Sequence, residues 1–421
     1  MVQNLHFTGG ARIFAFFTGD CAKPFLNFTK SFKKALSLIR NTIMQKNSEV
    51  LDRPLEEKYD DHLGLIDIDY VELYVNNAKQ AAFYYAKTFG YDIVGYRGLE
   101  TGVRDKASYL LQQGNIRMIL TTPLNGNSAI SEHIKIHGDG VKDIAFLVKD
   151  VDSAYTECIA RGADSAMEPC TVSDDSGTIR MAAIKTYGDT IHTFIDRRDY
   201  KGLFLPGFKE KSVLYTSESV GIEYVDHCVG NVELGKMNVW VGFYEKVLGF
   251  TQYIHFDDND IATEYSALMS KVMAGGRGRI KFPINEPAKG KKRSQIDEYL
   301  DFYGGPGVQH IALLTSDIVE TVTKLQSNGV EFLTVPTSYY KTLEERVGKI
   351  DENIDDLERL GILVDRDEEG YLLQIFTKPV SDRPTLFYEI IQRKGARGFG
   401  VGNFKALFEA IEREQEVRGN L

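Results

Sequence analysis

Residues 138–163 read GDGVKDIAFLVKDVDSAYTECIARGA, and residues 305–330 nearly repeat them as GPGVQHIALLTSDIVETVTKLQSNGV. Each copy begins with an apolar strand pattern and continues with a helical one. At one position of this match, Asp143 in the first copy is replaced by His310 in the second. The near repeat predicts that the chain consists of duplicated structural units, one of which carries a histidine that the other lacks.

An earlier pair of segments differs in the same way. Residues 70–75 (YVELYV) match residues 224–229 (YVDHCV), so that His227 takes the place of Leu73. Imidazole is a common metal ligand, and both replacements occur in the second copy. Duplicated halves with histidines in only one of them predict a metal site in the second half.

A third ligand-capable side chain, Glu389, lies in the middle of an apolar strand pattern at residues 385–393. A carboxylate is costly there unless it is paired or binds a metal. A loose alignment of the halves puts Phe194 at the equivalent position of the first half. Two imidazoles and one carboxylate on one face of a metal leave open positions for substrate and O₂, as in non-haem Fe(II) oxygenases. The remaining histidines are assigned to surface or packing roles: His6, His62, His133, His137, His192 and His255.

The hydrophobic patterns predict an α+β fold of two homologous halves, each of paired βαβββ modules that form an open curled sheet around a cavity. The predicted divisions are a dispensable extension at 1–60, a first domain at 61–205 without a metal site, a link at 206–221 and a catalytic domain at 222–421. The predicted strands are 69–75, 91–98, 105–114, 115–123, 222–229, 251–256, 262–273 and 277–284, and the predicted helices are 78–89, 151–161, 238–248, 318–328 and 343–360.

Glycines and an amphipathic segment add detail to this prediction. Gly90 and Gly249 follow two of the predicted helices and are expected to end them in the left-handed conformation. Residues 403–418 form a further helix, with an apolar face that is expected to close over the cavity as a lid. The residues of that face are Phe404, Leu407, Phe408 and Ile411.

Composition excludes several other classes of protein. The chain has 421 residues, 43% apolar and 26% charged, with a formal net charge of −10, which disfavours binding to nucleic acid or to an anionic membrane. No run of about 18 apolar residues predicts a transmembrane helix. The four cysteines are too few and too scattered for a disulfide framework, which favours a reducing, cytoplasmic setting.

Five segments carry a resemblance to a known family. VDHCVGNV (225–232), GPGVQHIALLTSDI (305–318), LLQIFTKPV (372–380), RPTLFYEIIQRKG (383–395) and GFGVGNFKALFEAIE (398–412) resemble the 4-hydroxyphenylpyruvate dioxygenases, a family of the vicinal oxygen chelate superfamily. In the first half, YRGLETGVRD (96–105) and HGDGVKDIAF (137–146) are also similar to that family. The resemblance covers roughly residues 69–416 and includes both halves.

The resemblance implies an assignment of site residues. His227, His310 and Glu389 would hold Fe(II). Gln295, Gln309, Gln374 and Phe404 would act in catalysis, and plain core packing is the competing interpretation of the phenylalanines, above all of Phe387. Asn285 and Gln295 fall in the polar stretch 283–295, which would otherwise be read as an exposed loop. The residues implied for the substrate pocket are Ser270, Asn285, Gln295, Gln309, Gln374, Phe376, Phe387, Phe399, Asn403 and Phe404.

The resemblance also implies a reaction. The substrates would be 4-hydroxyphenylpyruvate and O₂, and the products homogentisate and CO₂, in the catabolism of tyrosine and phenylalanine. Family members are commonly homo-oligomers through the first half. The alternatives are 4-hydroxymandelate synthase, against which Asn285 and Phe376 argue, an extradiol catechol dioxygenase, and a metal-free binding protein of the same superfamily.

Overall fold

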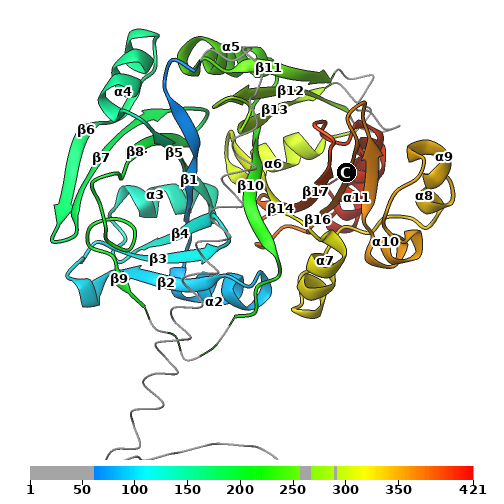
Figure 1. Cartoon of the computed structure of the whole chain (residues 1–421), viewed down its shortest axis with the longest axis horizontal. Coiled ribbons are helices and arrows are strands. Elements are labelled where there is room, and N and C mark those ends of the chain that lie inside the picture. The colour runs from blue at the N-terminus through cyan, green and yellow to red at the C-terminus, as the bar shows by residue number, and fades with distance from the viewer. Residues whose placement is uncertain are drawn as a thin grey trace, which may run out of the picture. The chain divides into compact units, whose positions relative to one another are not determined.

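The computed structural model describes residues 61–256, 267–288 and 292–420, apart from 212, 214 and 216. The predicted extension at 1–60 lies outside the described residues. Two mixed sheets, one from each half of the chain, stand side by side, and the C-terminal helix packs beside strands of the second sheet (Figure 1). The predicted architecture of two curled sheets is therefore confirmed.

The first half forms a nine-stranded sheet in the order β6-β7-β8-β5-β1-β4-β3-β2-β9. Within it, β1 and β4 run parallel, and so do β5 and β8. The strands are β1 (Leu65–Tyr74), β2 (Asp92–Arg97), β3 (Lys106–Gln113), β4 (Ile116–Pro123), β5 (Gly140–Val148), β6 (Ser165–Asp174), β7 (Gly177–Lys185), β8 (Ile191–Asp196) and β9 (Lys209–Glu210). The helices are α2 (Ala78–Thr88), α3 (Ala129–His137) and α4 (Val151–Ala160), with a 3₁₀ turn at Leu99–Thr101.

The second half forms an eight-stranded sheet in the order β15-β16-β17-β14-β10-β13-β12-β11, which repeats the first sheet strand for strand apart from β9. The strands are β10 (Ile222–Asn231), β11 (Thr251–Phe256), β12 (Ala267–Gly275), β13 (Ile280–Ala288), β14 (Gly307–Thr315), β15 (Leu363–Arg366), β16 (Tyr371–Phe376) and β17 (Phe387–Lys394). The helices are α5 (Met237–Leu248), α6 (Gln295–Tyr303), α7 (Ile318–Ser327), α8 (Ser338–Lys341), α9 (Leu343–Val347), α10 (Ile354–Leu360) and α11 (Val401–Arg418). The predicted paired βαβββ units are thus confirmed.

The predicted helix ends are confirmed at both glycines. Gly90 and Gly249 have φ of 73° and 67°, a region that glycine enters without strain. Gly90 is required for a second reason, because a Cβ there would lie 2.4 Å from the backbone oxygen of Glu218. The backbone of the link between the halves therefore packs closely against the end of α2.

Three predicted segments differ from the structure. The link at 206–221 adds β9 to the edge of β2 and buries Phe208, so it is part of the first domain's packing. The predicted helix at 343–360 is interrupted after α9 by Gly348, and the Asn353 side chain caps the start of α10. Residues 262–266 of one predicted strand lie outside the described residues, and β12 begins at Ala267.

Helices α3 and α6 were not predicted, and α6 changes the reading of the polar stretch 283–295. Asn285 lies in β13 and Gln295 opens α6, and both are buried. Ser294 and Asp297 form a capping box at the start of α6, which is the sequence signal that reveals this helix. The competing interpretation of an exposed loop at Asn285 and Gln295 is therefore excluded, because a strand and a helix take up both positions.

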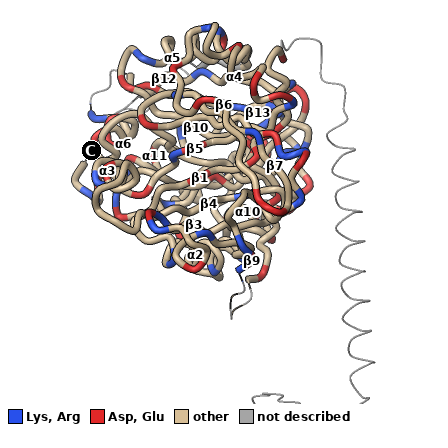
Figure 2. The backbone as a smooth tube through the Cα atoms, turned by 90° about the vertical axis from the view of Figure 1, so that its left-hand side faces the viewer, with Lys and Arg blue, Asp and Glu red and all other residues tan. Residues whose placement is uncertain are grey.

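Basic and acidic positions are mixed along the elements in view (Figure 2). Among the described residues, no helix is both long enough and apolar enough to cross a membrane.

Candidate metal centre

Three adjacent strands in the middle of the second sheet carry the predicted ligands. His227 lies on β10, His310 on β14 and Glu389 on β17. The Nε2 atoms of the two histidines lie 3.2 and 3.4 Å from the same Glu389 carboxylate oxygen. All three side chains are buried. The pairing of strands distant in sequence thus brings together residues from three separate segments of the chain.

Hydrogen bonds fix the orientation of both imidazoles. Nδ1 of His227 lies 2.8 Å from a carboxylate oxygen of Asp226, and Nδ1 of His310 lies 3.0 Å from the amide oxygen of Gln309. Both partners accept, so each Nδ1 carries a proton and each Nε2 is left to donate a lone pair toward Glu389. Neighbouring ligands at metal–ligand bonds of about 2.1 Å stand about 3 Å apart, which these donor atoms match.

The electrostatics of the cluster suit a cation. Although burial alone opposes it, His227 and His310 hold the pKa of Glu389 below its usual range. Burial lowers the pKa of His310, whereas Glu389 and Asp226 outweigh burial and raise the pKa of His227. A buried carboxylate that stays ionised is ready to bind a metal ion.

A buried ion pair supports His227 from behind. Asp226 makes two hydrogen bonds of 2.8 Å with Arg393 on β17. Burial opposes the charge of Asp226, but Arg393 and Lys281 hold its pKa well below the usual range. Asp226 lies at a β-bulge, where the register of β10 against β14 shifts, and a bulge redirects the local side chains. This is how Asp226 reaches the imidazole of its own neighbour.

The strand register corrects the match between the halves. His227 faces Ala312 on β14, and on β5 the residue equivalent to Ala312 is Ala145, which faces Tyr70. Tyr70 therefore takes the place of His227, and the predicted equivalence with Leu73 is wrong. The sequence match slips by three residues because YVELYV (70–75) and YVDHCV (224–229) resemble each other in letters, whereas the bulges of β1 and β10 lie at equivalent places and fix the structural match.

The strand register also shows that Thr193, and not Phe194, is the residue of the first half equivalent to Glu389. His310 pairs with Phe387, two residues before Glu389, while Asp143 pairs with Ile191, two residues before Thr193. The equivalence of Asp143 and His310 is confirmed. In the first half, a hydrogen-bonded cluster of Tyr70, Asp143 and Thr193 thus takes the place of the three ligand-capable side chains.

That cluster faces a filled interior. Tyr70 packs edge-on against Phe204, with ring centroids 5.5 Å apart, and belongs to an apolar cluster that includes Phe208. The second half, by contrast, keeps a cavity over its three ligand-capable residues. Its lining comprises His227, Val229, Leu268, Ser270, Val272, Pro283, Asn285, Gln295, Gln309, His310, Phe376, Phe387, Glu389, Phe399, Phe404, Leu407 and Phe408.

Two of the predicted pocket residues do not line this cavity. Gln374 is buried beneath Gly400. A Cβ on Gly400 would lie 2.3 Å from the side-chain oxygen of Gln374. Asn403 is buried and accepts a hydrogen bond of 2.6 Å from the hydroxyl of Tyr339. Strand alternation puts Gln374 on the same face as Phe376, but the turn into α11 covers it, so both residues support the wall from behind.

Helix α11 closes one side of the cavity. Its residues Phe404, Leu407 and Phe408 line the wall as the amphipathic pattern predicts. At its far end Arg418 makes hydrogen bonds of 3.1 and 2.7 Å with the buried carboxylate of Glu298 on α6. The helix is therefore fixed at both ends, by Asn403 at its start and by Arg418 at its last turn.

Sequence reasoning missed four apolar wall residues and the supporting ion pair. Val229 follows His227 by two positions, and Leu268 and Val272 flank Ser270 at the same spacing. Side chains two apart on a strand share a face, so the positions two residues away from each predicted ligand or pocket residue would have included them. The fourth, Pro283, precedes Asn285 by two positions on β13.

The fold and the site define a class of protein. Residues 225–375 match the model of the Glyoxalase/Bleomycin resistance protein/Dioxygenase superfamily, and residues 59–208 match the model described as hydroxyphenylpyruvate dioxygenase, N-terminal. A solved structure of a mutant 4-hydroxymandelate synthase from Streptomyces coelicolor superposes with a TM-score of 0.76 at 33% identity, covering 84% of this chain and all of the other (100%).

The curated relatives narrow this class. The 4-hydroxyphenylpyruvate dioxygenase of Dictyostelium discoideum is 51% identical over 363 residues, which span 84% of this chain and 99% of the relative. That of Danio rerio is 48% identical over 366 residues, spanning 85% and 92%. The chain belongs to the 4-hydroxyphenylpyruvate dioxygenase family.

Proposed function

We propose that this protein converts 4-hydroxyphenylpyruvate and O₂ into homogentisate and CO₂, with Fe(II) held by His227, His310 and Glu389. The observation that carries the proposal is the convergence of these three side chains on one point beneath a phenylalanine-lined cavity, in a chain of this family. Two imidazoles and a carboxylate on one side leave positions for a bidentate substrate and O₂.

The metal choice follows from the donor set. Nitrogen and oxygen donors without thiolate suit Fe(II) and disfavour softer ions. When bound there, Fe(II) would supply electrons for O₂ and a Lewis-acid site for the keto acid of the substrate. Asp226 and Gln309 would hold the two imidazoles in the tautomer that binds.

The cavity wall suits an aromatic ring. Phe387 lies on β17, the strand of Glu389, and Phe376 lies on the neighbouring β16. Phe399 packs edge-on against the His227 ring with centroids 4.9 Å apart. Aromatic side chains hold a ring in offset or edge-on contact. We assign these phenylalanines to positioning the phenol ring above the metal ligands, so that its substituted carbon lies close to them.

The polar end of the cavity suits a phenol hydroxyl. Ser270 and Asn285 face each other across β12 and β13, on the opposite side of the ligand strands from Phe376. Gln295 and Gln309 lie 3.4 Å apart between amide nitrogen and oxygen. These side chains would orient the hydroxyl, with Gln374 and Asn403 acting from behind the wall, and Phe404 would exclude water during the reaction.

A second candidate is 4-hydroxymandelate synthase, because a mutant of that enzyme shares the fold at 33% identity. Both activities start from the same substrate, so the product separates them. Purified protein loaded with Fe(II) should consume 4-hydroxyphenylpyruvate and O₂ and release homogentisate, as resolved by chromatography. Accumulation of 4-hydroxymandelate instead would establish the second activity, and no turnover would overturn both.

The metal itself is tested by reconstitution. Chelator-treated protein should recover activity with Fe(II) and not with Zn(II), Mn(II) or Co(II). His227→Ala, His310→Ala and Glu389→Ala should each lose metal or activity, and full turnover by any of them would contradict the ligand assignment. A cytoplasmic location and assembly into homo-oligomers through the first half stay predictions of the sequence.

A further inference from the structure

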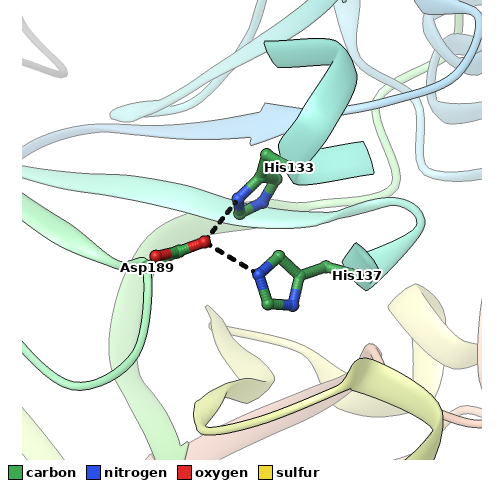
Figure 3. Close-up of side chains that lie close together, drawn as sticks. All are labelled: His133, His137 and Asp189. Atoms are coloured by element: carbon green, nitrogen blue, oxygen red, sulfur yellow. Dashed lines mark hydrogen bonds and ion pairs between the residues drawn. The ribbon is translucent and has the colours of Figure 1, made fainter. Parts of the chain in front are cut away.

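A second group of ligand-capable side chains lies in the first half, away from the cavity. His133 and His137 are one helical turn apart on α3, and Asp189 lies in the turn between β7 and β8. One atom from each residue lies within 4.8 Å of the others. Both imidazoles turn toward the same carboxylate oxygen (Figure 3). The histidines were assigned to surface or packing roles from the sequence, yet their contacts are those of a site.

The hydrogen bonds of His137 leave a place for a cation. Its Nδ1 lies 2.7 Å from the backbone oxygen of Tyr303, which only accepts, so Nδ1 carries a proton. Its Nε2 lies 3.0 Å from a carboxylate oxygen of Asp189, which also only accepts. A neutral imidazole would set two lone pairs against each other there. Either a second proton or a metal ion must lie between them.

The contacts of His133 favour a metal ion over a proton between His137 and Asp189. The His133 ring is 5% exposed, neither of its nitrogens makes a hydrogen bond, and its Nδ1 lies 3.7 Å from the same Asp189 oxygen. Leaving buried polar atoms unsatisfied is costly, and a proton on His137 does nothing for them. The two buried, unpaired ring nitrogens of His133 leave a lone pair that can bind a metal ion.

The distances suit a small divalent ion. Donor atoms on a tetrahedral Zn²⁺ with bonds of about 2.1 Å stand about 3.4 Å apart, and the two distances to Asp189 are 3.0 and 3.7 Å. Histidines one turn apart on a helix are a common arrangement for binding zinc. Lys142 is the opposing charge nearby, but its ammonium donates to the backbone oxygen of Asp189.

We propose that His133, His137 and Asp189 bind a divalent transition-metal ion, Zn²⁺ by their donor set, with water as the fourth ligand. The ion would join α3 and the β7–β8 turn to the end of α6, because Tyr303 both accepts from His137 and stacks on its ring with centroids 4.4 Å apart. Helix α6 begins at Gln295 in the cavity wall, so this second site would stiffen the junction between the halves.

The test counts zinc ions. Protein stripped by a chelator is titrated with Zn²⁺ in competition with a chromophoric chelator. The unmodified chain should bind two ions, His227→Ala one, Asp189→Asn one, and the double variant none. Lys135→Ala, on the exposed side of α3, is the matched control and should still bind two. Asp189 is 55% exposed in its side chain, so Asp189→Asn is expected to fold, which near-UV circular dichroism checks.

A second measurement reads the site directly. In His227→Ala, added Co²⁺ should give the visible absorption of tetrahedral cobalt, and added Zn²⁺ should raise the melting temperature by several degrees. Both effects should vanish in His227→Ala/Asp189→Asn. Loss of all zinc binding in His227→Ala, or zinc binding that persists in His227→Ala/Asp189→Asn, would overturn the proposal. Neither result depends on the dioxygenase activity.

Discussion

Asp226 and Arg393 have counterparts in the half without the ligand cluster. Asp69 lies at the equivalent bulge of β1, and Arg197 lies at the position of β8 that corresponds to Arg393 on β17. Nε of Arg197 donates to Asp69 over 2.9 Å. In both halves the pair joins two strands separated by a third, across roughly 9.6 Å of sheet. The pair is therefore a feature of the fold that the second half also uses to orient His227.

Asp226→Asn and Asp69→Asn separate these two roles. Removing one partner of a buried ion pair leaves the other charge unpaired, so each variant should lose on the order of 3 kcal/mol of stability, measured by urea unfolding. Only Asp226→Asn should also weaken binding of metal to the cluster, by about 10–100-fold, as measured by chelator competition. Equal metal affinity in the two variants would contradict the orienting role of Asp226.

Asp143 makes the stability of the first half depend on pH. Burial raises the pKa of Asp143 from 3.8 to about 7. The pKa of Asp143 is higher in the folded chain than in the unfolded chain. The neutral acid therefore stabilises the fold fully below pH 4, and this stabilisation is lost as the pH rises through 7. At about 1.4 kcal/mol per pKa unit, the loss reaches on the order of 4 kcal/mol.

Asp143→Asn should remove this loss. The free energy of unfolding of the variant relative to the unmodified chain should rise between pH 4 and pH 8, as followed by urea titration at several pH values. Metal bound at His227, His310 and Glu389 should be unchanged, since Asp143 belongs to the closed cluster with Tyr70. A stability difference that is the same at all pH values would contradict the raised pKa.

At the scale of elements, sequence patterns predict the repeated strands and helices because each unit has a clear period and a glycine at its helix end. They miss α3 and α6, which have nine residues each and are shorter than the window of about 11 residues in which a helical period is recognised. A match of letters also does not reveal which residues pair across strands, which is why Leu73 and Phe194 were placed where Tyr70 and Thr193 lie. The misplacement of Gln374 has another cause, since the turn into α11 covers the strand face on which it lies.

Helix α11 carries a prediction of its own. Phe404 lines the cavity, whereas Val417 on the same helix is 85% exposed. In Phe404→Ala, the ring of the substrate loses a contact and water can enter. We expect kcat/KM to fall about tenfold, the equivalent of 1.4 kcal/mol, and homogentisate formed per O₂ consumed to drop at least about twofold. Bound iron should stay unchanged.

Val417→Ala is the matched control and should behave like the unmodified enzyme in both measurements. An oxygen electrode combined with chromatography of the product gives the ratio directly. If Phe404→Ala keeps full rate and full coupling, α11 is structural cover for the cavity and does not protect the reaction.

At the scale of the whole molecule, the two halves share one core. Nε2 of His192 in the first half lies 2.8 Å from the hydroxyl of Tyr244 in the second. Tyr85 on α2 accepts a hydrogen bond of 3.0 Å from Tyr388, which is adjacent to Glu389 on β17. The first half therefore supports the strand that carries a proposed ligand, which gives this domain a role even though its own interior is filled.

A shared core predicts that the halves unfold together. Trp240, the only tryptophan in the chain, lies in the second half with its ring 6.0 Å from that of Tyr187. Tyr85→Ala removes a buried ring from the first half and should cost on the order of 3 kcal/mol. Because unfolding is expected to be cooperative, tryptophan fluorescence and far-ultraviolet circular dichroism should report the same lowered midpoint in urea. Phe83→Ala, on the exposed side of the same helix, should change the midpoint little. A circular dichroism transition that precedes an unshifted fluorescence transition would mean that the halves are independent, and that the ligand strands do not need the first half to stay in place.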